Sequence, residues 1–115
     1  MVVKHNDMKT EARPNMRGGE GTVYLTDLGR DGSMPHCRLA SVITLPKGAS
    51  IGYHQHVGET EMFAVIQGCG TVNDDGREFA VEAGDSVFTA DGHWHGIKNT
   101  GDIELKMVAV ITTIA

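Results

Sequence analysis

Three residues in the middle of the chain have the types and spacing of a metal site. His54 and His56 stand two residues apart, and Glu61 follows five residues after His56. Side chains two residues apart on a β-strand point to the same face, whereas on a helix this spacing places them on nearly opposite sides. A turn at Gly58 would bring Glu61 back on the next strand toward both imidazoles. Two neutral imidazoles and one carboxylate suit a first-row transition metal ion, so a metal centre is the first hypothesis.

The elements that must hold these residues are expected to be short β-strands. Runs of β-branched and aromatic residues alternate with turn signals, as at residues 30–33 and 73–76. No stretch shows helical periodicity over about three turns. The pattern predicts an all-β fold, a small antiparallel barrel or sandwich. The expected strands cover residues 21–28, 38–45, 51–56, 61–67, 71–72, 78–81, 86–89 and 103–113.

The segment 61–67 is apolar on both of its alternating faces. Phe63 and Val65 share a side with Glu61, and the other apolar residues take the opposite side. A strand covered on both sides belongs inside a sandwich or barrel, or at a subunit interface. Phe63 and Val65 are candidates for the apolar lining of a pocket, with Phe88 as a third, and all three suit an ordinary core equally well.

Length and composition limit the domain organisation and the class of partner. The 115 residues have room for one domain, expected over 21–115, behind a polar N-terminal arm of residues 1–20. The net charge of −5, without a basic cluster, argues against nucleic acid or an anionic membrane surface as a partner. No apolar run reaches membrane-spanning length, and the first residues lack the apolar core of a secretory signal. The two cysteines, Cys37 and Cys69, then suggest a reduced, cytoplasmic protein.

The sequence resembles the cupin superfamily in two motifs that together span residues 48–99. The first motif sets a His-x-His pair and a glutamate between two glycines, at spacings met by Gly48, His54, His56, Glu61 and Gly68. The second motif has four spaced positions, in the order glycine, glycine, histidine and asparagine. Gly84, Gly92, His95 and Asn99 have the required spacings. Ala90 stands where the family usually has proline, a departure that removes a rigid turn element and touches no expected ligand.

The resemblance implies a double-stranded β-helix, the jelly-roll cupin barrel, with one divalent transition metal ion in its mouth. The ion would be Fe, Mn, Ni, Co or Zn, and its ligands would be His54, His56, Glu61 and His95. About two positions of an octahedral ion would remain for water or a bidentate ligand. The resemblance also implies a homodimer, because small cupins pair through a sheet face and an exchanged N-terminal arm.

Three neighbours of the motif residues are candidates for related roles. His93 is a rival of His95 and Glu59 a rival of Glu61, and in both cases the motif spacing favours the second residue. His93 is then expected to line the pocket or to contact one of the metal ligands without binding the metal itself. Tyr53 is a candidate proton donor or acceptor, although alternation along a strand points it away from the ligands and favours a packing role. Tyr53 and His93 are therefore the candidate catalytic residues.

Two functions from different classes follow from the resemblance. Dioxygenases, decarboxylases, isomerases and lyases occur among cupins, which implies a metal-dependent enzyme acting on a small oxygen-rich or carbonyl compound. The alternative is a non-catalytic module that binds a metal or a small ligand, because no clear acid–base residue can be placed beside the ligands. Of these two functions, the metal-dependent enzyme is slightly favoured over the binding module. A DNA-binding regulator is disfavoured, since the chain has no room for a helix-turn-helix beside the barrel.

Overall fold

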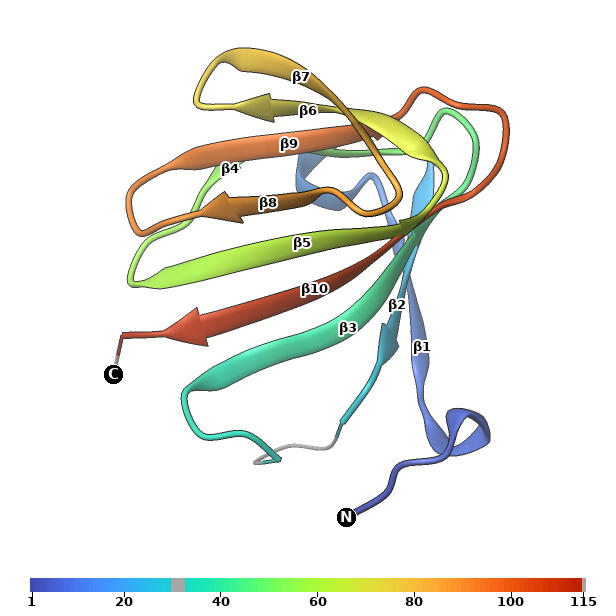
Figure 1. The fold of residues 1–115 in the computed structure, drawn as a ribbon, viewed down its shortest axis with the longest axis vertical. Coiled ribbons are helices and arrows are strands. Elements are labelled where there is room, and N and C mark those ends of the chain that lie inside the picture. The colour runs from blue at the N-terminus through green and yellow to red at the C-terminus, as the bar shows by residue number, and fades with distance from the viewer. Residues whose placement is uncertain (30–32, 115) are drawn as a thin grey trace.

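The computed structural model describes residues 1–29 and 33–114, which fold into two antiparallel β-sheets packed on one core (Figure 1). The six-stranded sheet has the order β1-β2-β3-β10-β5-β8, and the four-stranded sheet has the order β4-β9-β6-β7. The helical elements of this described part are two 3-10 turns, so no helix in it is long enough to cross a membrane. In chain order the elements are η1 (His5–Asp7), β1 (Thr10–Pro14), η2 (Met16–Gly18), β2 (Thr22–Asp27), β3 (Cys37–Leu45), β4 (Ser50–Gln55), β5 (Glu59–Gln67), β6 (Cys69–Asp74), β7 (Arg77–Glu82), β8 (Ser86–Thr89), β9 (Trp94–Asn99) and β10 (Leu105–Thr113).

This architecture confirms the prediction of an all-β, jelly-roll fold. Each expected strand is present, and most ends differ from the expected ones by one or two residues. The segment expected over 71–72 is the middle of a longer strand, β6, which forms the predicted hairpin with β7. The turn expected over 30–33 lies largely outside the described residues.

The N-terminal residues are more regular than the sequence indicates. Strand β1 pairs with β2, with Ala12 opposite Tyr24, and η2 occupies the tip of this hairpin. All five residues of β1 are exposed, so β1 has no buried face and shows no apolar alternation that could predict it. The boundary at residue 20 between an arm and a domain stays a prediction.

The apolar core lies between the two sheets. Ile43, Phe63 and Met107 come from the six-stranded sheet and meet Val72 and Ile97 of the four-stranded sheet. Each of these five side chains is at most 2% exposed. Burial of this apolar surface holds the sheets together and fixes the positions of the side chains that stand among these residues.

Strand β5 is covered on one side only within a single chain. Glu61, Phe63 and Val65 face the core, as expected, while Ile66 on the opposite side is 53% exposed. The suggestion that Phe88 lines a pocket is wrong, because its side chain is 64% exposed. Its backbone partner is Met62, a residue of the outward side of β5, so strand alternation turns Phe88 outward as well.

Candidate metal centre

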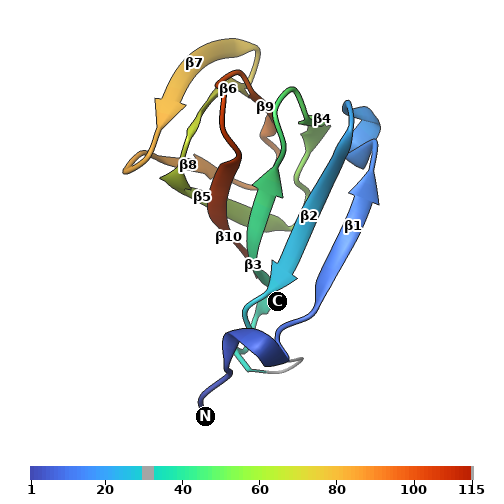
Figure 2. The same ribbon diagram turned by 90° about the vertical axis from the view of Figure 1, so that its right-hand side faces the viewer.

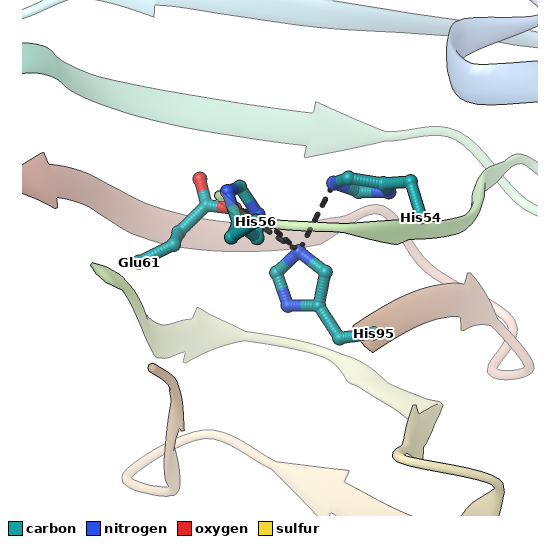
Figure 3. Close-up of side chains that lie close together, drawn as sticks. All are labelled: His54, His56, Glu61 and His95. Atoms are coloured by element: carbon teal, nitrogen blue, oxygen red, sulfur yellow. Dashed lines mark hydrogen bonds and ion pairs between the residues drawn. The ribbon is translucent and has the colours of Figure 1, made fainter. Parts of the chain in front are cut away.

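Four polar side chains from the two sheets meet in the interior (Figure 3). His54 in β4, His56 directly after β4, and His95 in β9 come from the four-stranded sheet, and Glu61 comes from β5 of the six-stranded sheet. One ligand atom of each residue lies within 4.8 Å of the others, and the set, here called the His/Glu group, could hold a metal ion. His56, Glu61 and His95 are at most 4% exposed, and His54 is half-buried.

Backbone pairing explains how residues from distant parts of the sequence meet. His54 and His95 are direct partners in the register between β4 and β9, so their side chains share one face. Gly58 has a φ of +75°, which forms the expected turn between His56 and Glu61. The backbone N–H of Gly58 also donates to the Asp91 carboxylate at 2.6 Å, which ties this turn to the loop before β9.

The ligand atoms are spaced like adjacent corners of an octahedron. His95 Nε2 lies 2.9 Å from His56 Nε2 and 3.2 Å from His54 Nε2. Glu61 Oε1 lies 3.0 Å from His56 Nε2 and 3.1 Å from His95 Nε2. Ligands about 2.1 Å from an ion are about 3.0 Å apart at adjacent octahedral corners and about 3.4 Å apart in a tetrahedron. The observed spacings therefore suit an octahedral ion on which two corners stay open.

Hydrogen bonds at Nδ1 turn the Nε2 atoms toward the centre of the group. His54 Nδ1 donates to the carbonyl oxygen of Gly52 at 2.7 Å, and His56 Nδ1 donates to the Glu59 carboxylate at 2.6 Å. Because both acceptors lack a proton, Nε2 of each neutral ring is a bare lone pair. These lone pairs point toward His95 Nε2 and the Glu61 carboxylate, where a cation would be shared by all four residues. The donor set therefore fits a metal ion, and the outer hydrogen bonds are those typical of metal-bound imidazoles.

Burial sets the charge state of His54. Burial, with smaller contributions from the charges of His95, Arg17 and His56, lowers the pKa of His54 to about 4, against the opposing hydrogen bond to Gly52. The ring is therefore neutral at neutral pH, which is the form that binds metals. The Glu61 carboxylate is buried as well, and a buried charge is costly without a cation beside it.

Glu59, the rival of Glu61 in the sequence, lies on the far side of the His56 ring. Besides accepting from His56 Nδ1, its carboxylate accepts two hydrogen bonds from Arg38, each of 2.7 Å. The hydrogen bond from Arg38, with a smaller contribution from His56, lowers the pKa of Glu59 to about 2. A charged carboxylate held in this way fixes the orientation of the His56 ring and keeps its Nε2 turned toward the centre of the group.

We expect Glu59→Gln to weaken metal binding about 10- to 100-fold, because an amide holds the His56 ring less firmly and adds no negative charge. The affinity is measured by competition with a chelating dye. Glu11→Gln is the matched control, since Glu11 also pairs with an arginine but contacts no histidine. Equal affinities of Glu59→Gln and Glu11→Gln would contradict the role given to Glu59.

The two candidate catalytic residues lie outside the His/Glu group. Tyr53 is 45% exposed and stacks on Trp94, with ring centroids 5.3 Å apart. His93 is exposed, and its Nδ1 pairs with the Asp75 carboxylate. This contact raises the pKa of His93, while hydrogen bonds from the Trp94 backbone N–H and from His93 lower the pKa of Asp75. Catalytic roles for Tyr53 and His93 stay predictions that these positions do not favour.

A cavity of about 300 Å³ adjoins the group, and its walls include residues that the motifs do not contain. Arg17 and Met16 of η2 line it together with Phe63, whose ring also stacks on His95 with centroids 4.9 Å apart. A larger hollow of about 1010 Å³ along β2, β3 and the N-terminus includes no residue of the group. The sequence does not predict that η2 lines this cavity. Its position depends on contacts between distant parts of the chain, which no local sequence pattern reveals.

Comparisons with known proteins identify relatives of this chain. Residues 41–111 match the family described as the cupin domain. The chain is 38% identical over 112 residues to an oxalate-binding protein of Thermotoga maritima, and the match covers 96% of this chain and 93% of that protein.

Two solved structures support the fold. A crystal structure described as a predicted oxalate decarboxylase from Thermotoga maritima superposes with a TM-score of 0.94 at 38% identity, covering 99% of this chain and all of the other. The structure of KdgF from Halomonas sp. superposes with a TM-score of 0.76 at 16% identity, over 99% of this chain and 93% of the other, and shows likeness of fold alone. With its motifs, its sheets and the match over residues 41–111, this chain belongs to the cupin family.

Proposed function

We propose that this protein binds oxalate, or a dicarboxylate of similar size, through one divalent transition metal ion held by the His/Glu group. The observation that carries the proposal is the 2.9–3.2 Å spacing of the ligand atoms, which suits an octahedral ion with two open corners. Oxalate can chelate through two oxygens and so occupy both corners. The cavity of about 300 Å³ suits a small ligand, and the relative known as an oxalate-binding protein supports this ligand.

A metal-dependent enzyme acting on the same compound is the second candidate. It is supported by the structure described as a predicted oxalate decarboxylase and by the Lewis-acid chemistry that a bound ion supplies. Apart from the His/Glu group, however, the described residues that line the cavity are arginines, an asparagine and apolar side chains. None of these is a good proton donor or acceptor near neutral pH. We therefore place binding ahead of turnover, which reverses the order that the family resemblance implies.

Calorimetric titration with oxalate tests the proposed function. The protein is freed of metal and then loaded in turn with Fe, Mn, Co, Ni or Zn. We expect about one oxalate to bind per chain with at least one of these ions, and none to bind to the metal-free protein. If oxalate does not bind to the protein loaded with any of these ions, the proposal is wrong. Steady loss of oxalate from the same solutions, with formate and carbon dioxide formed, would favour the enzyme.

We also propose that two copies pair through the outer face of the six-stranded sheet. Directly opposed outward residues form an apolar surface across four strands, made of Ala40, Val42, Met62, Ala64, Phe88, Val108 and Val110. Six of the seven are partly exposed in a single chain, and Phe88 is 64% exposed. None of them carries a charge, so the same surface on a second copy is a suitable partner for it.

Val110→Glu is expected to convert the dimer to a monomer, because it places a charge at the centre of this apolar surface. Sedimentation equilibrium should give about 25 kDa for the wild type, twice the chain mass of 12.3 kDa, and the chain mass for the variant. Ala80→Glu, an exposed position on β7 of the other sheet, is the control and should remain a dimer. A wild-type monomer, or a Val110→Glu dimer, would rule out this interface.

A further inference from the structure

The three arginines that line the cavity beside the His/Glu group differ in their partners. Arg13 donates to the Glu11 carboxylate at 2.8 and 3.2 Å. Arg38 donates to the Glu59 carboxylate with two hydrogen bonds of 2.7 Å. Within residues 1–29 and 33–114, the guanidinium of Arg17 has no hydrogen bond and no ion pair. Arg17 is therefore the cation of this cavity whose charge is not already matched by a carboxylate.

Arg17 is also close enough to act on the contents of the cavity. It lines the same walls as His54, His56 and Glu61. A ligand bound beside the group would lie in the field of this side chain.

The backbone of Arg17 has an unfavourable conformation. Its φ of 54° and ψ of 31° lie in the left-handed region, which is costly for a residue with a Cβ atom. Asn15, two residues earlier, is left-handed as well, but asparagine adopts this conformation more readily. Strained backbone of this kind persists only where the surrounding structure holds it, and it occurs often at ligand sites.

Close backbone contacts hold the Arg17 turn against β4 (Figure 2). A Cβ atom on Gly52 would lie 2.0 Å from the carbonyl oxygen of Arg17, and one on Gly19 would lie 2.2 Å from that of Ser50. Glu20 and Ser50 add a backbone hydrogen bond of 2.9 Å beside this contact. Only glycine at positions 19 and 52 permits the two backbones to lie this close. As a result η2 packs directly against β4, the strand that contains His54.

We propose that Arg17 binds a carboxylate of the ligand and makes the site prefer a dianion to a monoanion of the same size. This inference rests on the proposed function. A divalent ion and the Glu61 carboxylate leave one net positive charge, the two paired arginines add none, and Arg17 adds a second. A dicarboxylate neutralises both charges, whereas a monoanion leaves one unmatched and forgoes a charge-assisted hydrogen bond to the guanidinium.

Calorimetric titrations with oxalate and with oxamate test this role, because oxamate has the same shape but replaces one carboxylate by an amide. Metal-loaded Arg17→Gln is expected to bind oxalate about 10- to 100-fold more weakly than the wild type and oxamate with little change. Arg17→Gly should lose the same affinity while unfolding at no lower temperature than the wild type, since glycine removes the backbone strain. Arg77→Gln, which removes the same charge from an exposed arginine of β7 outside this cavity, is the control and should bind oxalate within about two-fold of the wild type.

The outcomes separate this inference from the proposed function. Wild-type affinity for oxalate in both Arg17 variants, at unchanged metal content, would overturn the inference and leave the proposed function standing. No binding of oxalate by the metal-loaded wild type would overturn both. An equal loss of oxalate and oxamate affinity in Arg17→Gln would also contradict the inference. It would show that Arg17 does not make the site prefer the dianion oxalate to the monoanion oxamate.

Discussion

The His95→Ala variant is expected to purify with less than about a tenth of an equivalent of metal, and the wild type with about one equivalent per chain. His95 is the hub of the His/Glu group, since its Nε2 lies within 3.2 Å of ligand atoms of the other three residues. Its loss removes one of four ligands and widens the space between the remaining ones. The expected loss of metal affinity is at least about 100-fold. Substitutions of residues that only hydrogen-bond to the metal ligands already lower the affinity about 10- to 100-fold, and the loss of a ligand should cost more. Elemental analysis of protein prepared without a metal-affinity tag measures the result.

His93→Ala provides a matched control for this experiment. His93 is the same residue type two positions away, but it is exposed and pairs with Asp75 outside the group. This variant should retain the wild-type metal content. If His93→Ala lost the metal and His95→Ala kept it, the ligand would be His93 and the proposed group would be wrong. Circular dichroism of both variants shows that the comparison is made between folded proteins.

Phe63→Ala is expected to lower the free energy of unfolding of the metal-free protein by about 3–5 kcal/mol. The side chain is 2% exposed within the core, and its ring stacks on His95 with an interplanar angle of 13°. Truncation loses the transfer free energy of the ring and leaves a cavity beneath the His/Glu group. A loss of this size is a large fraction of the about 5–15 kcal/mol that stabilises a typical domain.

Urea denaturation in the presence of a chelator measures this effect without the stabilisation that a bound metal adds. Phe63→Leu is the control, and it should cost about 1.5 kcal/mol or less because most of the volume remains. A cost below about 1 kcal/mol for Phe63→Ala would mean that the ring does not support the core as the structure indicates.

The sequence predicts local features of the site well, because they follow from the period of a strand. His54 and His56 fall on one face, and the turn at Gly58 returns Glu61 toward them. The place of His95 depends on the pairing of β4 with β9, which joins residues 41 positions apart. Spacing along the chain cannot show that pairing, and only the resemblance to cupins proposed it.

Other parts of the structure leave no local signal. Strand β1 is exposed at every position, so it lacks the apolar alternation by which strands are predicted. Arg17 reaches the cavity only because η2 packs on Gly52, a contact between distant segments. Glu59 and Glu61 are the same residue type two positions apart, yet Glu59 contacts Nδ1 of the His56 ring and Arg38, whereas Glu61 contacts Nε2 of that ring and His95.

The most direct test of a metal centre at the His/Glu group is a crystal structure with anomalous diffraction recorded above and below the absorption edge of the bound metal. We expect one anomalous peak per chain, about 2.1 Å from Nε2 of His54, His56 and His95 and from a carboxylate oxygen of Glu61. A peak elsewhere, such as between His93 and Asp75, or no peak after metal loading, would contradict it.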